Sequence, residues 1–215
     1  MHFRNVTLAA LVFATAAFAQ NDSGFQVRYA ANLQFGESFI NVTNTGANGA
    51  PLLGPGFGAA SGNICVNVYA FDPGEELISC CSCLVTPDQT VSLGVNRDLT
   101  SNTLTGVIPT SVTVKLVATL AGTGGSGTGT VCNNSAASIA GTTSVVSGMA
   151  AWGTTLHAAA VPGTFATTET AFTTSTLSAG ELSSAVGRCA SIIGNASGFG
   201  ICRSCRAGAL GAAHI

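Results

Sequence analysis

The residues with the clearest chemistry in this sequence are eight cysteines. They are Cys65, Cys80, Cys81, Cys83, Cys132, Cys189, Cys202 and Cys205. An even cysteine count favours a disulfide framework when a chain is exported, as the N-terminus of this one predicts. We therefore expect all eight to form disulfides. Because eight cysteines allow about a hundred pairings, their spacing alone does not fix the connectivity.

Strand geometry constrains the clustered cysteines. In an extended segment, Cys81 and Cys83 point to one face of the sheet and Cys80 to the other. These residues should therefore reach different partners, with Cys65 and Cys132 as candidates. Near the C-terminus, a Cys189–Cys202 bond would close a loop of about 14 residues, and we consider this pair as well.

Two alternative chemistries use the same sulfur atoms. The Cys80–Cys83 cluster together with Cys202–Cys205 offers soft ligands that suit zinc. The Cys-Arg-Ser-Cys segment 202–205 offers a redox pair with neighbouring arginines. The first set reads C-C-x-C at residues 80–83, which is not the paired signature of a zinc site, and the second lacks a βαβ setting. The sequence therefore predicts no metal site and no cofactor.

Other catalytic side chains are scarce. His157 would have to serve any Ser-His-Asp arrangement, but no G-x-S-x-G segment presents a serine. Asp72, Glu75 and Glu76 form an acidic cluster, which indicates a solvated turn, with Ca²⁺ binding as the alternative. We expect no catalytic residue. Exposed aromatic rings could still stack on a ligand, and the candidates are Tyr29, Tyr69 and Trp152.

The elements that would carry these residues are mostly strands. Apolar and β-branched residues alternate in several segments separated by Gly, Pro and Asn. A capping box, Ser178 to Glu181, precedes residues 182, 186, 189 and 193, which share one helical face. Glycine-rich loops are expected at 46–62 and 122–129. The predicted strands are 25–35, 38–46, 63–72, 77–85, 90–95 and 112–120, with two or three more in 142–177.

These elements predict a mainly β fold. We expect an antiparallel β-sandwich-like domain over residues 20–177, followed by a helix and a disulfide-stapled tail over 178–215. Residues 1–19 have the charged head, apolar run and Ala-x-Ala end of a signal peptide. The mature chain has no second run long enough to span a membrane. The predicted location is therefore extracellular or at the cell surface, with the periplasm as an alternative.

Composition narrows the functional classes. Charged residues make up 7% of the chain and the formal net charge is −2, which does not favour nucleic acid as a partner. Low charge, abundant threonine and disulfides are typical of a non-enzymatic structural or surface-interaction protein, such as a coat, matrix, filament or adhesin-like subunit. Self-association would use strand edges. The alternative is a secreted ligand- or carbohydrate-binding module with a glycan or cell-surface partner, and an exported hydrolase ranks third.

Overall fold

The computed structural model describes residues 23–52, 61–121, 132–140, 145–203 and 205–209. The expected signal peptide (1–19) and the expected loop at 122–129 lie outside these ranges. So does the centre of the expected loop at 46–62, namely residues 53–60.

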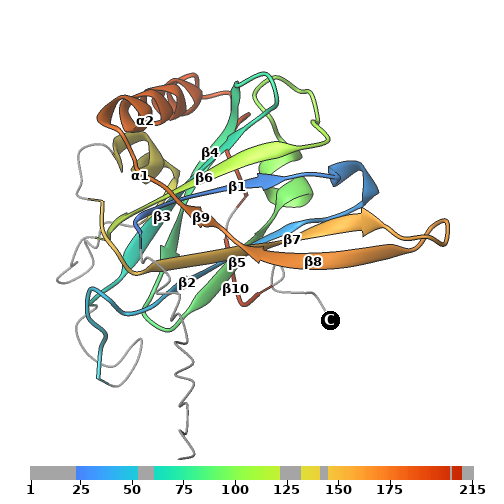
Figure 1. Ribbon diagram of the computed structural model, residues 1–215. Coiled ribbons are helices and arrows are strands. Elements are labelled where there is room, and N and C mark those ends of the chain that lie inside the picture. Colours follow the sequence, from blue (N-terminus) through green and yellow to red (C-terminus); the bar gives the residue numbers. More distant parts are fainter. Residues whose placement is uncertain (1–22, 53–60, 122–131, 141–144, 204, 210–215) are drawn as a thin grey trace, which may run out of the picture.

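The described chain forms two antiparallel sheets of five strands each, which pack face to face (Figure 1). The order in sheet A is β4 (Leu77–Val85), β3 (Ile64–Phe71), β6 (Val112–Leu120), β1 (Phe25–Ala30) and β9 (Thr173–Thr174). The order in sheet B is β10 (Arg206–Ala207), β5 (Thr90–Gly94), β2 (Phe39–Asn44), β7 (Met149–Ala158) and β8 (Phe165–Ala171). The prediction of a mainly β, sandwich-like domain is confirmed.

The period of two in the strand sequences builds the core between the sheets. Alternate residues of β3 and β6 point toward sheet B and are buried there, while intervening residues point to the opposite face. In the same way, alternate apolar residues of sheet B point toward sheet A. The inter-sheet core includes Ile64, Val66, Val68, Val114, Leu116, Ile40, Val42, Leu93 and Met149.

The outer face of sheet A is covered by helices. Helix α2 (Ala179–Gly194) starts after Ser178, whose Oγ accepts the Glu181 N–H, as the capping box predicts. Its most buried residues are Ala185, Cys189 and Ile192, so the contact face is rotated slightly from the predicted stripe. Because α1, α2 and Cys132 cover the outer face of sheet A, β3 is buried on both faces along its whole length.

Three short helical elements were not predicted. The segment expected to be extended over 25–35 ends as a strand at Ala30, and a 3₁₀ turn, η1 (Leu33–Phe35), follows. The strand expected over 90–95 ends at Gly94, where a π-helical turn, η2 (Val95–Thr100), begins. Helix α1 (Asn134–Ile139) is capped by the Asn133 side chain, which accepts the Ala136 N–H. Such one- or two-turn elements carry too few residues for a visible period.

Four disulfides tie the layers together and use every cysteine. The prediction of opposite faces for the clustered cysteines is confirmed, because Cys80 faces α2 whereas Cys81 and Cys83 lie between the sheets. Disulfides of this number indicate an oxidising compartment. The bonds are Cys65–Cys132, Cys80–Cys189, Cys81–Cys202 and Cys83–Cys205.

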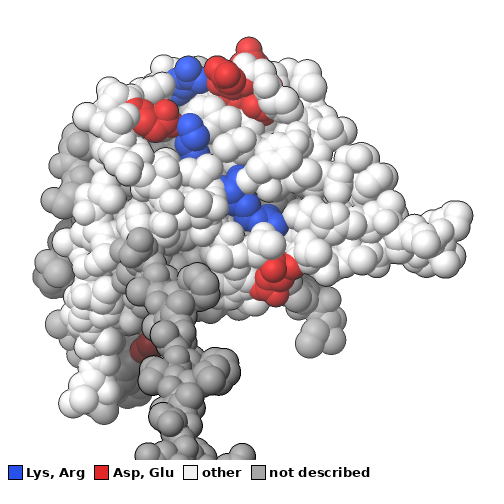
Figure 2. Space-filling model, in the orientation of Figure 1, with Lys and Arg blue, Asp and Glu red and all other residues white. Residues whose placement is uncertain are grey.

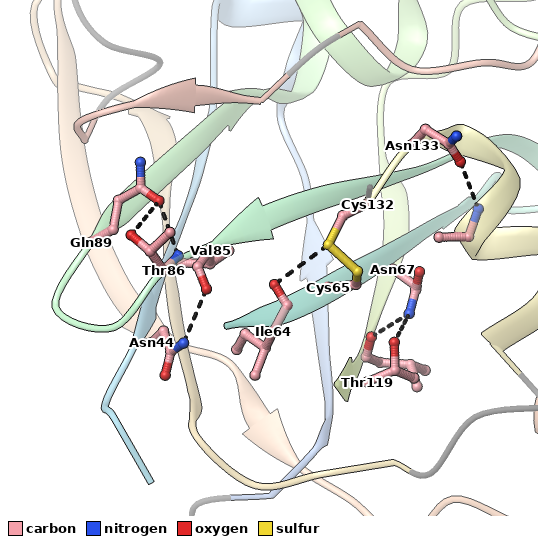
Figure 3. The surroundings of a disulfide bond; sticks show 12 residues. Asn44, Ile64, Cys65, Asn67, Val85, Thr86, Gln89, Thr119, Cys132 and Asn133 are labelled. Carbon is pink, nitrogen blue, oxygen red and sulfur yellow. Dashed lines mark hydrogen bonds between the residues drawn. A yellow bond between two sulfur atoms is a disulfide. The ribbon is translucent and has the colours of Figure 1, made fainter. Parts of the chain in front are cut away.

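The proposed individual pairings are wrong. Cys189 does not bond to Cys202, because α2 lies over β4 and brings Cys189 to Cys80. Neither Cys65 nor Cys132 bonds to a cysteine of the 80–83 cluster. They bond to each other on the helix-covered side of β3, just before α1 begins (Figure 3).

The C-terminal segment after α2 is joined to both sheets. Cys80 donates its N–H to the Gly200 carbonyl and accepts the Cys202 N–H, so residues 200–202 lie along β4. Further on, β10 pairs with β5 at the edge of sheet B. Within the described part of the chain, no helix has the length and apolar character needed to cross a membrane.

Candidate functional site

Among the described strands of more than two residues, β8 is the one exposed along its whole length, and the hairpin that it forms with β7 is here called the β7–β8 arm. Figure 1 shows its outer half projecting beyond the rest of the sandwich. The first half of β7 is largely buried, but all seven residues of β8 are exposed. Among the described residues, no strand pairs with the outer side of β8. The arm therefore ends sheet B with an open strand.

The other three sheet edges differ from β8. Strands β9 and β10 are each two residues long, so they offer little backbone to a partner. At the far edge of sheet A, residues 200–202 run alongside β4 and bond to the backbone of Cys80. Short strands and covering loops are the usual ways of protecting a sheet edge. The long open edge in the described structure is β8.

A groove of about 720 Å³ lies between the arm and β1. Its arm side follows from the pairing register, in which Thr155 lies opposite Thr168 and Gly153 opposite Thr170. Residues directly opposite share one face of the sheet. This face is the one that carries Met149 and Ala151 into the core, and it becomes open where sheet A ends. The groove is lined by Val27, Arg28, Tyr29, Ala31, Thr155, His157, Thr168, Thr170, Ala171, Thr173 and Ser175.

Arg28 forms the polar centre of this groove. It lies on the inner face of β1 and is only 8% exposed. Its Nε donates to Thr170 Oγ1 at 3.3 Å, Nη1 to the Thr154 carbonyl at 3.2 Å, and Nη2 to Thr155 Oγ1 at 2.7 Å. Burial lowers the pKa of Arg28, but an arginine stays charged at neutral pH. No carboxylate of the described residues forms an ion pair with it.

The local sequence makes room for this guanidinium. A Cβ on Gly153 would lie 2.5 Å from Arg28 Nη1, so the glycine in β7 leaves the space that the side chain occupies. The arm is also braced near its turn, by contacts with the segment 32–35. Asn32 donates to the Leu156 carbonyl at 2.8 Å, and the rings of Phe35 and Phe165 lie 5.7 Å apart. The groove therefore has fixed walls.

The three aromatic residues predicted as candidates for stacking on a ligand differ in exposure and position. Tyr29 is 62% exposed and lines the groove, as expected of a stacking residue. Tyr69 is fully buried, and its hydroxyl donates to the Ala137 carbonyl at 2.7 Å, so it is a core residue that cannot stack on a ligand. Trp152 lies half-buried on the other face of β7, away from the groove.

The histidine and the acidic cluster show no catalytic arrangement. His157 is exposed on the arm, and its Nε2 lies 2.8 Å from Thr168 Oγ1. Asp72 accepts the N–H groups of Gly74 and Glu76 through Oδ1, which closes the β3–β4 turn. Within the described ranges, no three His, Cys, Asp or Glu side chains are placed to hold a metal ion. All the cysteine sulfurs are committed to disulfides.

A second cluster of charges lies near α2, at the top of Figure 2. There Lys115 pairs with Glu181 and stands 4.6 Å from the ring centre of Phe71, and Arg188 donates to the Glu75 carbonyl. Cations and carboxylates in this cluster are close enough to neutralise one another. The groove differs because, within the described ranges, no carboxylate forms an ion pair with its buried cation. Figure 2 also shows that the tip of the arm is uncharged on this face.

Arg28 is the site residue that the sequence prediction missed. Its signal was the segment FQVRYA, in which alternation puts Gln26, Arg28 and Ala30 on one face. That face is the inner one, where Gln26 bridges the sheets through bonds to the Met149 carbonyl and the Ala151 N–H. A polar residue on the inner face of a strand marks either a bridge or a site.

No protein-family model, curated protein or solved structure shows significant similarity to this chain.

Proposed function

We propose that this chain is a secreted, non-enzymatic surface-interaction protein whose copies associate through β8. The observation that carries the proposal is the contrast among sheet edges. Two of the four are very short, one is lined by the C-terminal segment, and β8 is seven residues long and exposed throughout. Its sequence, FATTETA, has no proline, which would discourage edge pairing, and a single charged residue, Glu169.

Export supports the same conclusion. Four disulfides require an oxidising compartment, and the first 19 residues have the pattern of a signal peptide. A protein with a low content of charged residues and an internally braced fold suits stable packing outside the cell. We place it at the cell surface or in the extracellular matrix.

The partner that fits β8 best is a second copy of the same strand. Association of two identical edges about a two-fold axis is antiparallel and self-complementary. A register centred on Thr168 pairs all seven residues of each strand. In that register Thr167 lies opposite Glu169 of the other copy, twice per dimer. The side chains of these two residues alternate with Thr168 and Thr170, so they face away from the groove.

This register predicts opposite effects for two substitutions at one residue. Thr167→Lys places a cation opposite each Glu169 and should tighten the dimer about fivefold. Thr167→Glu places like charges opposite one another and should weaken it about fivefold. Sedimentation velocity at several concentrations measures both dissociation constants.

Ser183→Glu is the control, because Ser183 is exposed on α2, which packs on the outer face of sheet A and not on the arm. It should leave the dissociation constant at the wild-type value. A protein that stays monomeric at millimolar concentration would refute the proposal. Equal effects of the lysine and glutamate variants would refute the Thr168-centred register.

A further inference from the structure

Arg28 is a buried cation that forms no ion pair with any described residue. A guanidinium has five N–H donors, and three hydrogen bonds to the arm account for three of them. The remaining two, one on each terminal nitrogen, have no acceptor among the described residues. The three acceptors are neutral oxygens. A buried charge without a counter-ion is unfavourable, so a ligand that supplies a carboxylate would gain from this position.

We infer that the groove binds a saccharide that carries a carboxylate, such as a uronic-acid oligomer, with Arg28 as the partner of the carboxylate. Two donors on neighbouring terminal nitrogens can take the two oxygens of one carboxylate. The inference goes beyond self-association, because it assigns a ligand to the inner face of the arm and leaves the edge of β8 to the second copy.

The rest of the groove suits the body of such a ligand. Its volume of about 720 Å³ falls in the range of small-molecule sites and exceeds what a simple anion needs. Hydroxyl groups line its walls, and they can donate to or accept from sugar hydroxyls. Tyr29 presents an exposed ring at the rim, against which the apolar face of a sugar ring can pack. The hydroxyl-bearing wall residues are Thr155, Thr168, Thr170, Thr173 and Ser175.

The charge of the whole molecule makes this site specific. The chain carries a formal net charge of −2, so it does not attract anions in general. Glu169 is the carboxylate within β8, but it lies on the opposite face from Thr168 and Thr170. Retention of an acidic saccharide would therefore reflect the local environment of Arg28.

The first experiment uses the wild-type protein alone. Trigalacturonic acid, its neutral methyl ester and inorganic sulfate are titrated into the folded, disulfide-bonded protein and followed by calorimetry. The acid should bind at least about tenfold more tightly than its ester, because a charge-assisted pair is lost in the ester. Sulfate should compete only weakly, because it makes no contact with the walls that hold the sugar.

Variants then assign the effect to residues. Arg28→Lys keeps a charge but loses the two-pronged geometry, and it should weaken binding of the acid by about tenfold. Tyr29→Ala removes an exposed ring, leaves the core intact, and should weaken both the acid and the ester. Arg188→Gln removes one exposed cation outside the groove and should change nothing.

Three results would overturn the inference. They are equal binding of acid and ester, no binding of either at millimolar concentration, and sulfate competing as well as the trisaccharide. Thr167→Glu separates this inference from the proposed association. It should weaken the dimer and leave saccharide binding intact, so either idea can fail alone.

Discussion

Replacing Cys65 and Cys132 together by alanine is expected to lower the free energy of unfolding by about 4 kcal/mol, the largest loss for any one disulfide. Sequence separation alone would suggest otherwise. The two residues are 67 apart, whereas the other three pairs are separated by 109, 121 and 122 residues. The order reverses because the other three disulfides join the same two stretches of chain, residues 80–83 and 189–205.

Because these three bonds link the same two stretches of chain, each closes only a short loop in the unfolded chain once the others have formed. Cys81 and Cys83 are close neighbours, and so are their partners Cys202 and Cys205. Once Cys81–Cys202 exists, the Cys83–Cys205 bond closes a loop of only about five residues, worth about 2 kcal/mol. The Cys80–Cys189 bond closes roughly 14 residues, worth about 3 kcal/mol. Only Cys65–Cys132 retains its full loop.

Chemical denaturation without reductant measures the effect, with the Cys83→Ala/Cys205→Ala protein as the matched comparison. Both variants lose two buried or partly buried sulfurs, so the packing losses largely cancel. The first variant should be less stable than the second by about 2 kcal/mol. Equal stabilities, or the reverse order, would show that packing at each bond outweighs the entropy of the unfolded chain.

Much of the fold could be predicted from the sequence because strands with one buried face carry their own signal. Apolar residues alternate clearly in the sequences of β3 and β6, and the capping box of Ser178 and Glu181 marks the start of α2. Helix α1 and the two-residue strand β10 are set by tertiary contacts, which a local pattern does not contain. Disulfide connectivity is likewise set by tertiary contacts. Alternation gave the directions of Cys80 and Cys81, but only the packing of α2 on β4 selects Cys189.

The candidate site could be predicted only in part, for a physical reason. Of the candidate stacking residues, Tyr29 is exposed whereas Tyr69 is buried, since an alternating pattern does not say which strands are covered on both faces. The importance of Arg28 depends on its lack of an ion pair among the described residues. Its position depends on the pairing of β7 with β8 and on the space left at Gly153. Neither is a property of a single segment.

The proposed association and the proposed ligand reinforce each other geometrically. Antiparallel pairing of two β8 strands about a two-fold axis perpendicular to the sheet keeps the same face of each arm on the same side. Thr168 and Thr170, which line the groove, therefore face the same way in both copies. Two grooves side by side could hold one acidic polysaccharide at two points, which raises its apparent affinity without any new contact.

The π-helical turn η2 is joined to the C-terminal segment by one buried carboxylate. Asp98 is fully buried and accepts the Gly94 N–H at 2.6 Å, Arg206 Nη1 at 2.7 Å and Arg97 Nη2 at 3.2 Å. Burial by itself raises the pKa of Asp98. Hydrogen bonds from Arg206, Arg97 and Gly94, together with the charge of Arg206, outweigh burial and hold the pKa below its ordinary value.

Asp98→Asn is therefore expected to destabilise the protein by about 3 kcal/mol at pH 7, because two arginines lose their shared counter-ion. This lies at the lower end for a broken buried ion pair, since both arginines keep contact with water. The folded-state pKa lies below the unfolded value of about 3.9, so the stabilisation is present above that pH. It is lost as the pH falls through the folded-state pKa.

Denaturant unfolding of wild type and variant from pH 7 down to pH 2 tests this pH dependence. The difference in stability should be full at neutral pH and should shrink below about pH 4, where protonated Asp98 resembles the asparagine. Asp88→Asn makes the same chemical change at an exposed turn and should cost little at any pH. A difference between Asp98→Asn and wild type that stays constant into acid would mean that packing, and not the charge of Asp98, holds η2 to the segment around Arg206.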